Sequence, residues 1–149
     1  MASTTFSGPV TSTNGFIGAL TGNVAGTGKI THATTAAINA TATATAAQVA
    51  TGYITSTSAA ATAITLPTGT LLGAALGAVQ GTVFDLYVDN TAGASTVTMV
   101  VAVNGILSSA AADTHGSFGD LTIAAGATGI ARYTLMFASA TAYVFTRTA

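Results

Sequence analysis

The stretch GTVFDLYVDNTAGASTVTMVVAVNG, residues 81–105, decides the expected fold because two strand-like segments flank one turn signal in it. In its first arm, residues 83–89, apolar and polar side chains alternate with the period of a β-strand. Its second arm, residues 96–103, is dense in Val, Thr and Met. Residues 90–95, between the arms, include Asn and Gly, which tolerate positive φ. The sequence therefore predicts a β-hairpin that pairs the two arms.

Further strand signals lie on both sides of this hairpin. Residues 52–57 and 60–66 are expected strands, and the second must end at Pro67, because proline cannot donate a hydrogen bond to a central sheet ladder. Between Pro67 and the hairpin, residues 68–79 are expected to form a short buried helix or an irregular crossover. After the hairpin, strands are expected at residues 120–124, 130–138 and 141–147, with a turn at Ser139–Ala140 between the last two.

This spacing of strands and turns is typical of an all-β fold, an antiparallel β-sandwich or a jelly-roll-like domain. The strand periods also predict which side chains form the core. The expected core residues are Ile54, Ile64, Leu66, Phe84, Leu86, Val88, Val97, Met99, Val101, Val103, Leu121, Ile123, Leu135, Phe137 and Val144, with some of Tyr133, Tyr143 and Phe145.

The first part of the chain has a different composition and is expected to be an extended N-terminal arm. Residues 1–29 are rich in Gly, Thr, Ser and Asn, and residues 39–46 alternate Ala or Asn with Thr. The alternation suits small-residue strands that approach neighbours closely, or a flexible linker. We therefore expect an arm at residues 1–44 and a β-sandwich domain at residues 45–149. Widely spaced apolar residues in the arm are expected to dock on the body of the same chain, on a sister subunit or on a larger lattice, the alternative being a disordered tail. The candidate docking residues are Phe6, Pro9, Val10, Phe16, Ile17 and Leu20.

Charge is scarce throughout the chain. Charged residues make up 5% of the 149 residues and the formal net charge is −1, whereas about 25% is usual for soluble domains. Without a basic patch, neither nucleic acid nor an anionic membrane surface is an expected partner. An Ala, Thr, Ser and Gly surface suits a subunit of an assembly, the alternative being a monomer solvated by its hydroxyl groups. The chain has no Cys, so disulfides and thiolate metal sites are excluded.

No stretch of the sequence indicates export or membrane insertion. The start of the chain lacks the basic and apolar regions of a signal peptide. The best apolar run, residues 71–79, is about half the length that a membrane helix needs. The Gly69, Gly73 and Gly77 spacing therefore does not indicate a membrane helix pair.

The catalytic interpretation is weak at each candidate residue, and we expect a protein that is not an enzyme and carries no cofactor or metal. His32 lies in the expected arm. His115, between Asp113 and Asp120, lacks a third firm metal ligand and is interpreted as part of a solvated loop. Asp85 and Asp89 share one face of a strand, but at four residues apart they are too distant for paired acid and base chemistry.

A phosphate-loop interpretation also fails. In GNVAGTGK, residues 22–29, Ile30 stands where the motif requires Ser or Thr.

Several segments together resemble a β-domain found in small virion proteins of tailed phages. They are TAAQVATGYIT at 45–55, LPT at 66–68, GTVFDL at 81–86 with DNTAG at 89–93, TIAAG at 122–126, RYTL at 132–135 and YVF at 143–145. The opening TFSGPV at 5–10, with NGF at 14–16, resembles the start of phage head-associated proteins.

This resemblance implies a capsid decoration, or cement, protein. Such a subunit is made in the host cytoplasm, forms a homo-oligomer, with a trimer expected, and binds the outside of the virion head. There it stabilises the lattice of the major capsid protein, its expected partner. The alternative implied by the same resemblance is a head-fibre or tail-fibre module that binds a host receptor or glycan through exposed tyrosines such as Tyr53, Tyr87, Tyr133 or Tyr143.

Overall fold

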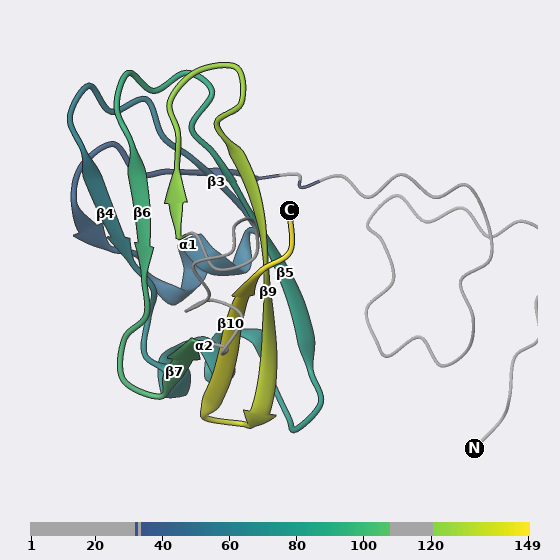
Figure 1. Cartoon of the computed structure of the whole chain (residues 1–149). Helices are drawn as coiled ribbons and strands as arrows, with labels where there is room; N and C mark the ends of the chain where they lie inside the picture. Colours follow the sequence, from purple (N-terminus) through teal and green to yellow (C-terminus); the bar gives the residue numbers. More distant parts are fainter. Residues whose placement is uncertain (1–31, 33, 108–120) are drawn as a thin grey trace, which may run out of the picture. The chain divides into compact units, whose positions relative to one another are not determined.

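Two β-sheets contain the strands of the described chain, which in this computed structural model comprises residue 32 and residues 34–107 and 121–149. Sheet A has the strand order β1-β3-β5-β9-β10-β7, and sheet B has the order β2-β4-β6-β8. Figure 1 shows the sheets as two facing layers. The strands of sheet A are β1 (Ala36–Ala37), β3 (Tyr53–Thr55), β5 (Val83–Asp89), β7 (Gly105–Leu107), β9 (Ile130–Ser139) and β10 (Ala142–Arg147), and those of sheet B are β2 (Ala42–Thr43), β4 (Thr62–Thr65), β6 (Val97–Val100) and β8 (Thr122–Ile123).

The first six strands form three stacked β-arches, in which each strand of sheet A is followed by a strand of sheet B. β1 leads to β2, β3 to β4, and β5 to β6, and successive arches pair in parallel in both sheets. The arches are also joined to one another at their turns. Asn39 and Thr41 of the first arch accept hydrogen bonds from the backbone N–H groups of Thr57 and Ala63 in the second.

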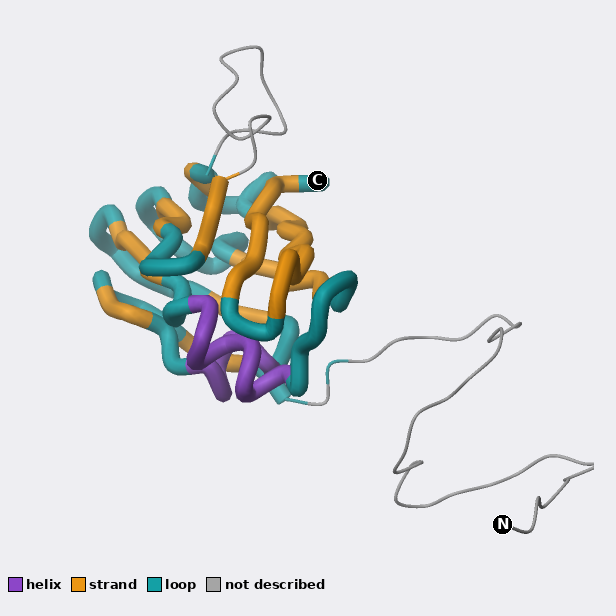
Figure 2. The backbone as a smooth tube through the Cα atoms, turned by 90° about the horizontal axis from the view of Figure 1, so that it is seen from below, coloured by secondary structure: helices purple, strands orange, loops and turns teal. Residues whose placement is uncertain are grey.

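Two short helices return the chain from sheet B to sheet A and contact each other; Figure 2 shows them side by side. α1 (Ala46–Ala50) begins with a capping box in which Thr45 and Gln48 satisfy each other's backbone N–H groups. α2 (Gly69–Leu76) has Thr68 as its N-cap and ends at Gly77 in the left-handed conformation, φ 59°. The expected helical crossover in residues 68–79 is therefore confirmed.

One core lies between the two sheets. Inward side chains of both layers are buried, among them Ile54, Ile64, Leu86, Met99 and Phe145. Most of the expected core residues are buried, and Phe84, Val101 and Leu121 are partly buried against the cluster. Two of the expected core residues are not buried. Val103 is 72% exposed because it follows the end of β6. Val144 is half-buried because Tyr143 and Phe145 take the inward positions of β10.

The predicted hairpin is wrong, although both of its arms are strands. β5 belongs to sheet A and pairs with β3 and β9, whereas β6 belongs to sheet B. The turn signal between them marks the corner of the third arch. Asn90 is fully buried there, and its side-chain amide donates to the carbonyl oxygens of Ser95, Ile123 and Ala124. These hydrogen bonds hold the chain where it crosses from one layer to the other.

The expectation of antiparallel pairing throughout is also wrong, because both sheets are mixed. β5–β9, β9–β10 and β6–β8 are antiparallel, but the arch strands pair in parallel, as do β7 and β10. The strand-rich class is confirmed, as is the turn between β9 and β10.

The first arch lies within residues 1–44, which the sequence assigned to an arm. β1 and β2 pair with β3 and β4 of the domain. The compact unit that contains them runs from Thr31 to Ala149. The expected docking residues Phe6, Pro9, Val10, Phe16, Ile17 and Leu20, and the Asp113, His115 and Asp120 group, lie outside the described residues.

Candidate interaction surface

A polar cluster occupies the outer face of sheet A near the arches. β3, β5 and β9 are adjacent, and their register aligns Tyr53 with Tyr87 and Tyr87 with Arg132. The rings of Tyr53 and Tyr87 are stacked, with centroids 6.3 Å apart and an interplanar angle of 20°. The Arg132 guanidinium lies 5.9 Å from the Tyr87 ring centroid, a distance that permits a cation–π contact.

Both carboxylates of β5 are hydrogen-bonded within this cluster. Arg132 and Thr134 donate to Asp85 over 2.6 and 2.8 Å, while Tyr53 donates to Asp89 over 2.9 Å. Partial burial alone would raise the pKa of Asp85, but the bonds from Arg132 and Thr134 outweigh it and lower that pKa. The pKa of Asp89 is lowered chiefly by the hydroxyl of Thr91. Both carboxylates are therefore ionised near neutral pH.

His32 covers the edge of the same cluster. Its ring centroid lies 6.0 Å from that of Tyr53 and 5.7 Å from that of Tyr87. Its Nδ1 lies 2.9 Å from the carbonyl oxygen of Thr51, which can only accept, so Nδ1 carries the proton. A side chain at Gly52 would overlap the imidazole, so the close approach of His32 requires a glycine there. The His32 ring thus lies beside both tyrosine rings.

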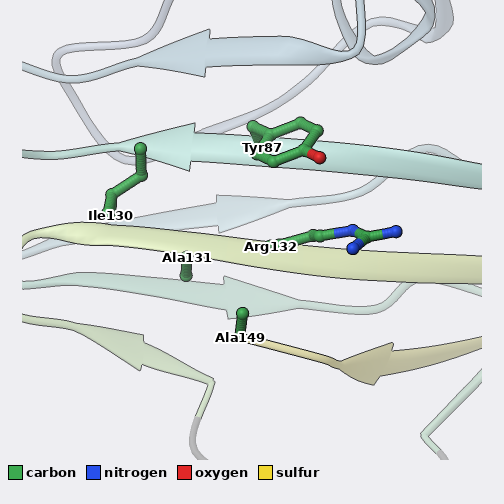
Figure 3. A pocket seen from close by; sticks show the side chains of 5 residues that line it. All are labelled: Tyr87, Ile130, Ala131, Arg132 and Ala149. Atoms are coloured by element: carbon green, nitrogen blue, oxygen red, sulfur yellow. The ribbon is translucent and has the colours of Figure 1, made fainter. Parts of the chain in front are cut away.

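A shallow hollow of about 370 Å³ lies beside Tyr87 and Arg132. Its other lining residues are Ile130, Ala131 and Ala149. Figure 3 shows Tyr87 on β5 and Arg132 on the neighbouring β9 lying next to each other, with Ile130 further along the same strand. The hollow offers one aromatic ring, one cation and an apolar floor on the strands of a sheet.

The chemistry available to this face is recognition by stacking and hydrogen bonding. Asp85 and Asp89 each accept bonds that favour the ionised form, so neither is prepared to act as a general acid. No group of three His, Cys, Asp or Glu side chains with metal-binding geometry occurs in residues 32, 34–107 and 121–149. That the protein is not an enzyme stays a prediction.

Two of the four tyrosines named for a glycan platform belong to the core. Tyr133 and Tyr143 are fully buried, and Tyr133 stacks on Phe145 with ring centroids 4.7 Å apart. The Tyr143 hydroxyl donates to the carbonyl oxygen of Pro67 over 3.0 Å. Burial raises the pKa of Tyr143 to about 12, although a backbone hydrogen bond from Ala102 acts in the opposite direction. A platform on this domain is therefore limited to Tyr53 and Tyr87.

At the other end of the outer face, an apolar row crosses four strands. The register aligns Val83 with Met136, Met136 with Val144, and Val144 with Ile106. Val83 is 60% exposed, Met136 51% and Ile106 55%. These four residues, here named the apolar row, form a strip from β5 to β7 in which Val83, Met136 and Ile106 are exposed and Val144 is half-buried.

The apolar row belongs to an uncharged end of the domain, named here the α2 end and comprising residues 69–83, 101–107 and 136–144. None of these residues is Asp, Glu, Lys or Arg. Leu71, Val79 and Val103 are additional exposed large apolar residues in the same segments. The charged side chains of the described chain are Asp85, Asp89, Arg132 and Arg147, all outside this end. Six of the eight exposed large apolar residues of the described chain lie in this end, whereas Ile130 lies beside Arg132 and Val100 lies on sheet B.

The sequence predicted part of the polar cluster, namely Asp85 and Asp89 on one face and Tyr53 and Tyr87 as exposed tyrosines, but it did not predict the apolar row. Met136 and Val144 could have been identified from alternation, because Tyr133, Leu135 and Phe137 on β9 and Tyr143 and Phe145 on β10 form the inward set. The ion pair of Arg132 could not be predicted from the residues near it in sequence, because its partner Asp85 lies on β5.

No described helix is long and apolar enough to cross a membrane. No family model, no curated protein and no solved structure matches the chain.

Proposed function

We propose that this chain is a virion decoration protein that attaches to a phage capsid lattice through its α2 end. The apolar row is the observation that carries the proposal. Ordinary monomers rarely leave a contiguous apolar strip across several strands exposed, and this strip lies in an end without charge. The resemblance to small virion proteins gives the partner, the major capsid protein on the outside of the head.

The composition of this end supports a contact driven by apolar burial rather than by ion pairs. The row supplies Val83, Met136, Val144 and Ile106, and the charge two residues from Val83 on the same strand, Asp85, is paired with Arg132. Attachment should therefore depend weakly on salt, because salt screens charges and leaves apolar burial in place. Residues 1–31, with Phe6 and Phe16, would serve as an extended arm that adds a second contact.

The finer description of the body belongs to the same proposal. The two facing sheets would act as a sandwich-like block, and several copies would sit side by side on the head. The resemblance implies a homo-oligomer, with a trimer expected. Localisation on the outer capsid surface, after synthesis in the host cytoplasm, follows from this role.

The test compares two aspartate variants of exposed apolar residues. Met136→Asp places a charge in the apolar row, and Val100→Asp places one on the outer face of sheet B, where Val100 is 39% exposed. We expect Met136→Asp to weaken binding to heads that lack this protein by at least about tenfold, and Val100→Asp to bind as the unchanged protein does. Cosedimentation with such heads measures the affinity. Equal binding of the two variants would remove the apolar row as the attachment surface.

A second candidate function has its own observation, the hollow between Tyr87 and Arg132. An aromatic ring with a guanidinium and a carboxylate beside it suits a sugar ring, which stacks on the π face and hydrogen-bonds at its edge. In that case the chain is a fibre module that binds a host glycan.

Glycan-array binding decides between the two functions. Glycan binding that Tyr87→Ala abolishes and Tyr87→Phe retains would favour the fibre module, and the absence of binding on the array would retire it. Met136→Asp should leave any such binding unchanged.

A further inference from the structure

Both sheets have an open edge in the same arch. β1 is the outermost strand of sheet A and β2 the outermost strand of sheet B, and they are the two halves of the first arch. In the third arch, by contrast, β5 is covered by β9 and β6 by β8, both antiparallel. The stack of arches is closed on one side and open on the other within the described residues.

The open edge presents unused backbone groups in both layers. The Ile38 N–H donates to the carbonyl oxygen of Thr55, and the Ala44 N–H donates to that of Thr65. Because successive N–H groups of a strand point to opposite sides, the N–H of Ala37 points away from β3 and that of Thr43 points away from β4. Ala37 and Thr43 are both exposed.

Of the features that usually prevent edge-to-edge association, this edge has one, the shortness of its strands. Natural sheets protect edges with Lys, Pro, bulges or inward-pointing charges. From β1 to β2, residues 36–43 read AAINATAT and contain no charge and no proline. The strands are short, however, so the number of hydrogen bonds that a partner can gain is small. A weak, concentration-dependent contact is expected.

We propose that this edge pairs with the same edge of a second copy of the chain. Ala37 is the residue of β1 that directs its backbone groups outward, so an antiparallel pair must centre on it. The Ala37 N–H of each copy then donates to the Ala37 carbonyl of the other, which is the two-fold-related, hydrogen-bonded pair of an antiparallel ladder. β2 reaches the same partner through Thr43. Sheet A becomes one continuous sheet across both copies.

The self-complementary pattern identifies a second copy as the occupant. A two-fold contact needs one patch that presents matched donors and acceptors to itself, and Ala37 offers one of each. The small side chains of the first arch let two backbones approach without a clash. This contact is two-fold and therefore competes with a trimer built on the same edge. It does not depend on the proposed attachment to capsids.

The experiment uses a charge swap at Ala37 in the full chain. In the pair, the two Ala37 residues are directly opposed, at a Cα separation of about 5.5 Å. Like charges there should raise the dimer dissociation constant at least about tenfold. Ala37→Lys and Ala37→Asp should each be monomeric, an equimolar mixture of the two should dimerise, and Ala37→Ser should behave as the unchanged chain. Sedimentation velocity from the micromolar to the millimolar range measures the association.

Four results would overturn the proposal: a monomer at every concentration, a trimer, a dimer that Ala37→Lys leaves intact, and failure of the Lys and Asp variants to associate when mixed. If residues 1–31 of the same chain cover the edge, the full chain stays monomeric and a chain that starts at Thr31 dimerises, which also overturns it. Head binding by Ala37→Lys separates this proposal from the attachment through the α2 end, since loss of the dimer should leave the apolar row intact.

Discussion

The two ends of the domain join the same two sheets by different means. One is the α2 end, and the other, named here the arch end, comprises residues 38–41, 56–61 and 90–96, where the three arches cross from sheet A to sheet B. At the arch end, hydrogen bonds of polar side chains link the layers, above all those of Asn90 with carbonyl oxygens of Ser95 and Ala124. At the α2 end, close packing joins them. Gly69 and Gly73 of α2 lie so near the turn between β9 and β10 that an added Cβ at either residue would overlap a backbone oxygen of that turn.

The two ends also differ in whether their surface side chains are used within the fold. The arch end uses its polar groups internally, and the cluster of Asp85, Asp89 and Arg132 lies on the sheet beside it. The α2 end has no charged side chain in the ranges that define it and leaves apolar side chains exposed. The polar side chains of the arch corners are thus used within the fold, whereas the exposed apolar side chains of the α2 end are not.

Gly73→Ala gives the largest expected loss of stability and tests packing at the α2 end. The new methyl group would overlap the carbonyl oxygen of Ala140, so helix and turn must separate. We expect a loss of about 3 kcal/mol, the range of overpacked core sites. Gly77→Ala is the matched control, because the space around Gly77 is open and the left-handed backbone alone should cost about 1 kcal/mol. Urea denaturation measures both variants, and equal losses would contradict the close-packing account.

Asn90→Ala comes next and tests the arch end. The substitution removes the amide that donates to Ser95, Ile123 and Ala124, leaving buried acceptors without donors. The Asn90 Oδ1 has no hydrogen-bond partner among the described residues, so its removal offsets part of the loss. A net loss of about 2 kcal/mol is expected. Asn39→Ala is the control, because Asn39 is an exposed arch residue with one side-chain hydrogen bond, and its loss of stability should be about 0.5 kcal/mol. If it destabilised the protein as much as Asn90→Ala does, burial would not determine how much an arch hydrogen bond contributes to stability.

Much of the fold follows from local patterns. The positions of β3, β4, β5, β6, β8, β9 and β10, the helical alternative for the crossover, the end of β4 before Pro67 and a turn between β9 and β10 were predicted, because each depends on residues within a few positions of one another. β1 and β7 lie in segments for which no strand was predicted. The side of the sheet to which each residue of β5 points was also predicted, from its period of two.

The pairing of strands did not follow from the sequence. Asn90 and Gly93 predict a turn equally well in a hairpin and in an arch, since the local backbone requirement is the same. What separates the two is the set of carbonyl acceptors on the other sheet, and Ile123 and Ala124 are far from Asn90 in sequence. The three stacked arches do not appear in the sequence as a repeat of fixed length, because their turns and helices differ in length.

The candidate surface was predicted in part. The pairing of Asp85 and Asp89 on one outward face is confirmed by β5, whose inward residues are Leu86 and Val88. Their partners could not be predicted, because Arg132 and Tyr53 come from separate strands. Low charge was visible in the composition, but its segregation away from the α2 end needed the topology.

Tyr143→Phe has the smallest expected effect of the three main variants and tests a buried hydrogen bond near the α2 end. The hydroxyl is buried and donates to Pro67, so its loss should cost about 1 kcal/mol at neutral pH. Because burial raises the pKa of Tyr143 to about 12, the unfolded chain loses this proton first as pH rises, and stability should fall between pH about 10 and about 12. Tyr143→Phe should show a shallower alkaline fall. Thermal unfolding followed by circular dichroism across this pH range measures the slopes, and equal slopes for Tyr143→Phe and the unchanged chain would contradict the raised pKa of Tyr143.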